Sequence, residues 1–177
     1  VDRSRGLGDV YKRQALKNQL AIAVALLASL MGQPATAQGE GDVVLEPKSC
    51  NRSRMMNKLK QKPNQGPCAR VVIEQVDGNY ITIQFLARGT ERGSSNSLSL
   101  AGTTKTPLSC RLKKCRLSQP LQLELDNAKE VAYDSEGKEI SLPSAWPAVG
   151  SCQLSPKAVS CSARSMFNAS WEAKATF

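Results

Sequence analysis

The six cysteines of this chain are the residues whose type and spacing best predict a chemistry. They are Cys50, Cys68, Cys110, Cys115, Cys152 and Cys161. An even number of cysteines in a small exported domain is typical of a disulfide framework, whose pairing the sequence alone does not determine. Two of the sequential pairs bracket short segments, Arg-Leu-Lys-Lys and a stretch with a Ser-Pro-Lys turn, so each pair is expected to meet across a hairpin. The first two cysteines are then left to pair with each other.

Redox or metal chemistry at these cysteines is the alternative. Basic residues around Cys110 and Cys115 would favour a thiolate. Their spacing, however, is not the Cys-x-x-Cys of thiol oxidoreductases, and the irregular spacing of all six cysteines does not match a four-cysteine zinc site. We therefore expect structural disulfides, and neither a metal nor an organic cofactor.

The absence of histidine limits the catalytic chemistry open to this chain. It excludes Ser-His-Asp and Cys-His catalysis, imidazole acid–base chemistry and every histidine-ligated metal site. An enzyme would have to rely on carboxylates, lysine or cysteine. The candidate carboxylates are Glu124 and Asp126, which lie on one face of a predicted strand, about 7 Å apart. That separation overlaps the one that glycosidases use, but any solvent-facing strand produces it, and no aromatic cluster flanks the pair. We expect no catalytic site here.

Lysine and arginine gather in two clusters, in a chain whose formal net charge is +9. The candidate anion-binding residues are Arg52, Arg54, Lys58, Lys60 and Lys62 in the first cluster, and Arg111, Lys113, Lys114 and Arg116 in the second. A positive field favours anionic partners, although charge clusters also occur on simple solvated surfaces. Nucleic-acid binding usually adds aromatic stacking platforms, which are scarce near both clusters. The sequence does not identify the partner; an anionic macromolecule of the cell envelope is the candidate that these charges favour.

Alternating apolar residues indicate that most of the chain is β-structure. The segment Val71–Leu86 predicts a hairpin with the loop Asp77-Gly78-Asn79, a register that opposes Val71 to Phe85 and Ile73 to Ile83. Further strands are expected at Ser97–Leu100, Leu121–Asp126, Glu130–Tyr133, Lys138–Leu142, on both sides of the Cys152–Cys161 turn and at Trp171–Phe177. Short strands separated by turn signals predict a small antiparallel sandwich or barrel, stapled by disulfides.

One short N-terminal helix is expected beside these strands, over Ser49–Lys62. Its sequence, SCNRSRMMNKLKQK, has a narrow apolar stripe, and either Ser49 or Asn51 could cap it. The segment Pro63–Pro67 would end it. Because so narrow a stripe gives a marginal helix, a bridge from Cys50 to Cys68 is expected to hold it against the strands.

The first 37 residues are expected to lie outside the folded domain. Residues 1–14 resemble translated sequencing-adaptor read-through and are expected to be foreign. Residues 15–37 have the three parts of a secretory signal peptide: a basic start at Lys17, the apolar run Leu20–Met31 and the small-residue site Ala35-Thr36-Ala37. The apolar run is shorter than the roughly 20 residues that span a bilayer, so no stable membrane anchor is expected after cleavage. Residues 38–177 are expected to form one mature, β-rich domain.

These patterns together predict an exported, non-enzymatic, disulfide-stabilised binding or structural module of the periplasm or the extracellular space. Two other functions stay open. One is a carboxylate-dependent glycan hydrolase of the cell envelope that uses Glu124 and Asp126. The other is a secreted inhibitor that presents Arg111–Lys114 as a disulfide-braced loop, since a preorganised loop loses less entropy on binding.

Overall fold

The computed structural model describes residues 39–56, 64–140 and 143–177. The adaptor-like segment, the expected signal peptide and residues Lys58, Lys60 and Lys62 lie outside these ranges. Gln38–Phe177 forms one compact unit. Its secondary structure is β throughout the described part, which confirms the prediction of a mainly β protein.

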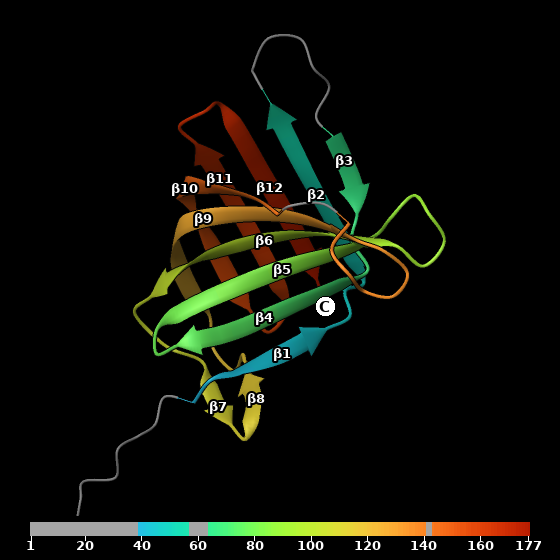
Figure 1. The fold of residues 1–177 in the computed structure, drawn as a ribbon. Helices are drawn as coiled ribbons and strands as arrows, with labels where there is room; N and C mark the ends of the chain where they lie inside the picture. Colours follow the sequence, from blue (N-terminus) through green and yellow to red (C-terminus); the bar gives the residue numbers. More distant parts are fainter. Residues whose placement is uncertain (1–38, 57–63, 141–142) are drawn as a thin grey trace, which may run out of the picture. The chain divides into compact units, whose positions relative to one another are not determined.

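The strands of this unit form a single sheet (Figure 1). They are β1 (Gly41–Leu45), β2 (Ser49–Met56), β3 (Asn64–Pro67), β4 (Arg70–Asp77), β5 (Tyr80–Arg88), β6 (Ser95–Thr104), β7 (Ser109–Arg111), β8 (Lys113–Arg116), β9 (Leu121–Tyr133), β10 (Ser144–Ser155), β11 (Ala158–Ser165) and β12 (Ala169–Thr176). Their order in the sheet is β3-β2-β12-β11-β10-β9-β6-β5-β4-β1-β8-β7. All neighbouring strands run antiparallel except β1 and β8, which run parallel.

The sheet curls into a half-barrel, so the expected sandwich of two sheets does not form (Figure 1). The side of the half-barrel formed by β2 and β3 is joined to the side formed by β4 and β5 at the segment that connects β3 to β4. The backbone N–H of Cys68 donates to the carbonyl of Cys50 on β2 at 3.2 Å, and the N–H of the next residue, Ala69, donates to the carbonyl of Leu86 on β5 at 2.7 Å. The Cys50–Cys68 disulfide reinforces this junction.

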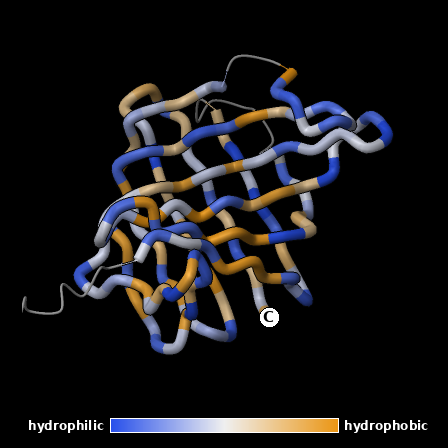
Figure 2. Tube along the Cα trace, turned by 60° about the horizontal axis from the view of Figure 1, so that its bottom comes forward, coloured by the Kyte–Doolittle hydropathy of each residue, from blue (hydrophilic) through white to orange (hydrophobic). Residues whose placement is uncertain are grey.

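The apolar core lies on the inner face of the curled sheet. Hydrophobic and hydrophilic residues alternate along the strands, as Figure 2 shows, because successive side chains point to opposite faces. Fully buried side chains include Val71, Ile73, Ile81, Ile83, Phe85, Leu98, Leu100, Leu123, Leu154, Val159 and Trp171. Burial of this row of large side chains supplies the main free energy that favours folding.

The predicted register of the β4–β5 hairpin is confirmed, since Val71 faces Phe85 and Ile73 faces Ile83. The turn itself differs from the expected three-residue loop. Asp77 pairs with Tyr80, and the register shifts between Gln75 and Asp77. This bulge lets a tighter turn keep the apolar residues on one face.

The predicted N-terminal helix is wrong in its described part, because Ser49–Met56 is strand β2. It pairs with β12 on one side and β3 on the other. Alternate residues of the segment, Cys50, Arg52 and Arg54, face the same side as buried Ala175, Ala173 and Trp171 of β12. Backbone pairing with two neighbours and the Cys50–Cys68 bridge outweigh a weak helical preference. The remainder of the predicted helix, residues 57–62, lies outside the described residues.

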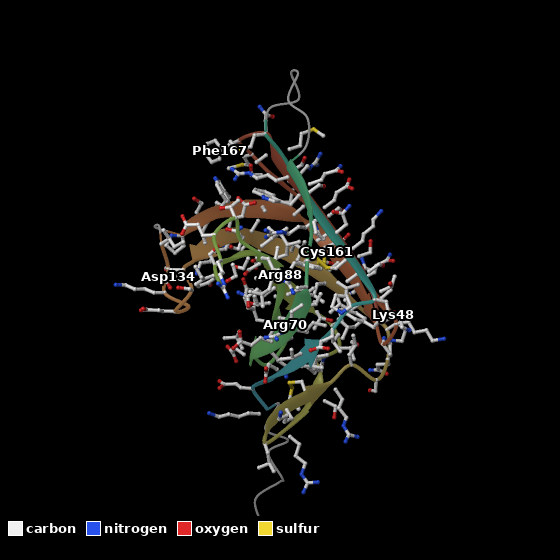
Figure 3. All side chains as sticks on the ribbon, turned by 90° about the vertical axis from the view of Figure 1, so that its right-hand side faces the viewer. Lys48, Arg70, Arg88, Asp134, Cys161 and Phe167 are labelled. Atoms are coloured by element: carbon white, nitrogen blue, oxygen red, sulfur yellow. A yellow bond between two sulfur atoms is a disulfide. The ribbon has the colours of Figure 1, made fainter. Side chains whose placement is uncertain are left out.

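Three disulfides form between sequential cysteines, Cys50–Cys68, Cys110–Cys115 and Cys152–Cys161. The last pair joins register partners on β10 and β11 and is fully buried; its yellow bond lies at the label of Cys161 in Figure 3. Three such bridges fit an oxidising compartment outside the cytoplasm. Within the described ranges, no helix is long and apolar enough to cross a membrane.

Candidate anion-binding site

A polar pocket of about 330 Å³ opens on the inner face of the half-barrel. Strands β2, β6, β9 and β10 contribute its main polar lining residues, Arg52, Arg54, Asn96, Glu130 and Ser144. The pocket adjoins the apolar core, because Leu98 lines it and is itself buried. Two arginines from the first predicted basic cluster therefore lie in a pocket of the fold.

Strand pairing explains why these charged side chains face inward. Arg54 lies directly opposite Trp171 in the β2–β12 ladder, and Trp171 is only 1% exposed. Directly opposite residues of an antiparallel pair share a face, so Arg54 and also Arg52, two residues earlier, lie on the inner face. By the same rule Glu130 on β9 faces inward, because its register partner on β6 is the buried Leu98.

Glu130 holds the centre of the site through both of its carboxylate oxygens. Arg54 Nη1 lies 2.5 Å from Glu130 Oε2, and Trp171 Nε1 donates a hydrogen bond to Glu130 Oε1 at 3.2 Å. The side chains of Arg54 and Glu130 are 27% and 24% exposed, so the ion pair is shielded from much of the solvent. A partly buried and hydrogen-bonded pair of this kind fixes the positions of both groups.

Two tryptophans form the aromatic wall beside this ion pair. The Arg54 guanidinium lies over the ring of Trp146, 5.0 Å from the ring centroid, within the range of a cation–π interaction. The rings of Trp146 and Trp171 are 5.4 Å apart at an interplanar angle of 42°, a tilted arrangement that aromatic pairs favour. Arg54 is thereby held on two sides, by a carboxylate and by an aromatic face.

Arg52 is the cation of the site that has no fixed partner within the described part of the chain. It lies in none of the side-chain hydrogen bonds or ion pairs that those residues form. Burial lowers the pKa of Arg52 from its ordinary value, and the negative charge of Glu130 acts in the opposite direction. An arginine keeps its charge even so, and that charge is only partly compensated in the pocket.

The site therefore offers two guanidinium groups to one carboxylate, whose oxygens are already engaged. Arg54 Nε is also buried without a hydrogen-bond partner among the described residues. Guanidinium groups bind carboxylate, sulfate and phosphate oxygens through paired, charge-assisted hydrogen bonds. The arrangement can accordingly accept one anionic group beside Arg52.

The second predicted basic cluster lies elsewhere, on the β7–β8 hairpin at the opposite edge of the sheet from β3 (Figure 1). Its members, Arg111, Lys113, Lys114 and Arg116, are all exposed. The structure thus separates the two clusters: Arg52 and Arg54 turn inward, whereas the hairpin carries its cations outward. No common anion-binding face joins the described members of both clusters.

The predicted carboxylate pair lies on the outer face of β9. Glu124 and Asp126 are both exposed and do not line the inner pocket. Asp126 accepts a hydrogen bond from the Tyr80 hydroxyl at 2.8 Å. Burial, this hydrogen bond and the negative charge of Asp126 raise the pKa of Tyr80 to about 12.

Three residues of the site were not anticipated from the sequence: Glu130, Trp146 and Trp171. They lie on three different strands, and their meeting depends on the order of β9, β10, β11 and β12 in the sheet. The available signal is the period-two spacing of Cys50, Arg52 and Arg54, which would have placed both arginines on the inner face of a strand.

Comparison with known proteins adds no assignment to this geometry. No protein family model matches the chain, and no curated protein or solved structure is similar enough to count as a match.

Proposed function

We propose that residues 38–177 form an exported, non-enzymatic, disulfide-stabilised binding module whose inner pocket takes an anionic group of its ligand. The observation that carries this proposal is the half-buried Arg52 guanidinium, which lies on the pocket beside an ion pair that is already satisfied. Three disulfides support export, since such bridges persist in oxidising compartments.

The dimensions of the pocket define the class of ligand. A volume of about 330 Å³ is at the small end of ligand pockets, so it holds one residue of a polymer or a small molecule. One net positive charge matches a single carboxylate, sulfate or phosphate ester. Trp146 beside Arg54 adds an aromatic surface for the rest of the ligand. The terminal or side group of an acidic envelope glycan has this combination of charge and size.

The test is a titration of intrinsic tryptophan fluorescence, because Trp146 and Trp171 both contact the Arg54–Glu130 pair. The probes are glucuronate, glucose 6-phosphate and glucose 6-sulfate, with glucose as the uncharged comparison. We expect saturable quenching or enhancement with at least one anion. Arg52→Gln should weaken that binding about tenfold or more, since a hydrogen bond to a charged group contributes about 1.5 to 3 kcal/mol.

The matched control is Arg164→Gln, which removes an exposed arginine from β11. It should leave the anion affinity unchanged. No spectral response to any of the anions, or equal affinities of the wild type and Arg52→Gln, would remove the pocket from the proposal.

A glycan hydrolase that uses Glu124 and Asp126 is the enzymatic alternative. Two features make it the weaker hypothesis: the pair lies on an open strand face, and Tyr80 occupies one oxygen of Asp126. Changing both carboxylates to amides should abolish the turnover of such an enzyme on an acidic glycan. Unchanged turnover in that double variant would end this alternative.

An inhibitor that presents Arg111–Lys114 is the second alternative. At the tip of the hairpin, Leu112 and Lys113 have φ values of 51° and 62°. A loop that imitates an extended peptide substrate requires negative φ values along its length. The hairpin would therefore have to block an enzyme by some contact other than substrate-like insertion.

A further inference from the structure

The β7–β8 hairpin presents one apolar side chain at its tip. Its turn is formed by Leu112 and Lys113, and Leu112 is 88% exposed. Both residues have φ values in the left-handed region, where glycine or asparagine is the usual choice. Neither a hydrophobic core nor easy turn formation explains a leucine at this position.

Three features hold the strained turn in place. The Cys110–Cys115 disulfide joins the two short strands, which also pair residue by residue. Strand β1 runs alongside β8, with Gly41 opposite Lys113. A Cβ atom at Gly41 would lie 2.6 Å from the carbonyl carbon of Lys113, so β1 approaches the turn as closely as only glycine allows. The tip is thus braced by the disulfide and by β1, with Leu112 at its end.

Positive charge surrounds the leucine. Arg111, Lys113, Lys114 and Arg116 are exposed on the same hairpin. Nitrogen-tipped side chains project from it at the lower end of the view in Figure 3. The nearby acids of β1 are Glu40, just before the strand, and Asp42, the register partner of Lys114. Neither forms an ion pair with the hairpin among the described residues.

We infer that this hairpin docks on an anionic lipid surface, with Leu112 inserted among the headgroups and the four cations on their phosphates. A tip with one apolar side chain among lysines and arginines matches the surface of a bilayer, where negatively charged headgroups cover the apolar acyl chains. A polyanionic glycan would use the cations but gain nothing from the leucine. A protein partner requires about 20 to 30 residues on each side of a stable interface, whereas the braced hairpin spans only Ser109–Arg116.

The test is flotation of the protein with lipid vesicles. Vesicles of phosphatidylcholine with about one quarter phosphatidylglycerol supply the anionic surface, and pure phosphatidylcholine vesicles are the comparison. The wild type should float with the anionic vesicles alone, and less of it at high salt, because salt screens the charges. Leu112→Asn should weaken the partition about tenfold, since asparagine tolerates the left-handed turn but leaves the bilayer without its apolar anchor.

Two control variants isolate the hairpin. Met166→Asn removes an apolar side chain that is 83% exposed in the β11–β12 turn, and it should bind the vesicles as the wild type does. Lys157→Glu reverses a charge in the β10–β11 turn and should have little effect, whereas Lys114→Glu should weaken binding strongly. Arg52→Gln should also bind as the wild type, which separates this inference from the pocket proposal.

Two results would overturn the inference. One is the absence of flotation with anionic vesicles at low salt. The other is equal flotation of Leu112→Asn and the wild type with the anionic vesicles. That second result would show that the hairpin recognises negative charge alone.

Discussion

At the scale of single residues, the inward-facing carboxylate of Glu130 has a hydrogen-bond partner on each oxygen, whereas the two inward-facing arginines lack partners for some of their N–H groups within the described residues. Glu130 has a partner on each oxygen, from Arg54 and from Trp171. Arg52 has none among the described residues, and Arg54 Nε is buried without one. A buried donor without an acceptor reduces stability, so the unpaired Arg54 Nε beside the half-buried Arg52 is consistent with a site arranged for an external anion.

Tyr80 provides a prediction on the outer face. Burial, and secondly the hydrogen bond to Asp126, raise its pKa to about 12, which is above the value of about 10 in an unfolded chain. The folded state therefore keeps this proton more tightly. Stability from this group is complete below pH about 10 and is lost as the pH rises toward 12. Ultraviolet titration of tyrosine ionisation should show the Tyr80 transition near pH 12.

Asp126→Asn tests the cause of that shift. It removes the negative charge and weakens the hydrogen bond, so the Tyr80 transition should move to lower pH but stay above its unfolded value, because burial is the larger cause. Tyr80→Phe should delete the transition and thereby assign it. A Tyr80 transition that does not move in Asp126→Asn would show that the carboxylate has no part in the shift.

At the scale of elements, two pairs of neighbouring strands, β6 with β9 and β10 with β11, approach each other as closely as only glycine allows. Gly102 on β6 and Gly150 on β10 are both register partners of Leu125, and the register shifts beside each of them. A Cβ atom at Gly102 would collide with the carbonyl oxygen of Glu124, and one at Gly150 with the carbonyl oxygen of Ser162. These are backbone atoms of the sheet and have little freedom to move aside.

Gly102→Ala and Gly150→Ala should each destabilise the domain by about 2 kcal/mol or more, through strain in the ladder on either side of the bulge. Chemical denaturation followed by tryptophan fluorescence measures this loss. Gly66→Ala on edge strand β3 is the matched control, because nothing lies within 4 Å of its added Cβ atom. If all three variants unfold at the same denaturant concentration, the close approach of the strands has no energetic importance.

The elements also show where the sequence was informative. The alternation in Val71–Leu86 predicted the register of β4 and β5, because every second residue there is apolar and buried. Strand β2 was predicted as a helix from a narrow apolar stripe and a capping residue, because its inward residues after Cys50 are Arg52 and Arg54 and so show no apolar alternation. The sequence marked both arginines as anion-binding candidates. It could not show that Glu130 faces them, because that depends on pairing across several strands.

At the scale of the whole domain, the Cys50–Cys68 disulfide links parts that lie far apart in the order of the sheet. Cys50 belongs to β2, whereas Cys68 is followed at once by the residue that bonds to Leu86 of β5. This junction determines how far β2 lies from β5 and β6, and so how Arg52 and Arg54 are placed over the pocket. By contrast, the Cys110–Cys115 bridge is local to one hairpin.

Replacing Cys50 and Cys68 together by alanine should therefore affect both stability and the site. Loss of a bridge that spans 18 residues should cost about 3 kcal/mol, by release of the unfolded chain. Since β2 would also loosen at its junction, Arg54 should move away from Trp146, and acrylamide should quench tryptophan fluorescence more strongly. Thermal unfolding and quenching are measured on the same sample.

The double variant Cys110→Ala, Cys115→Ala is the comparison, and its tryptophan quenching should match that of the wild type. Equal quenching in the two double variants would mean that the backbone bonds of Cys68 and Ala69 are enough to hold the half-barrel, and with it the pocket, in shape.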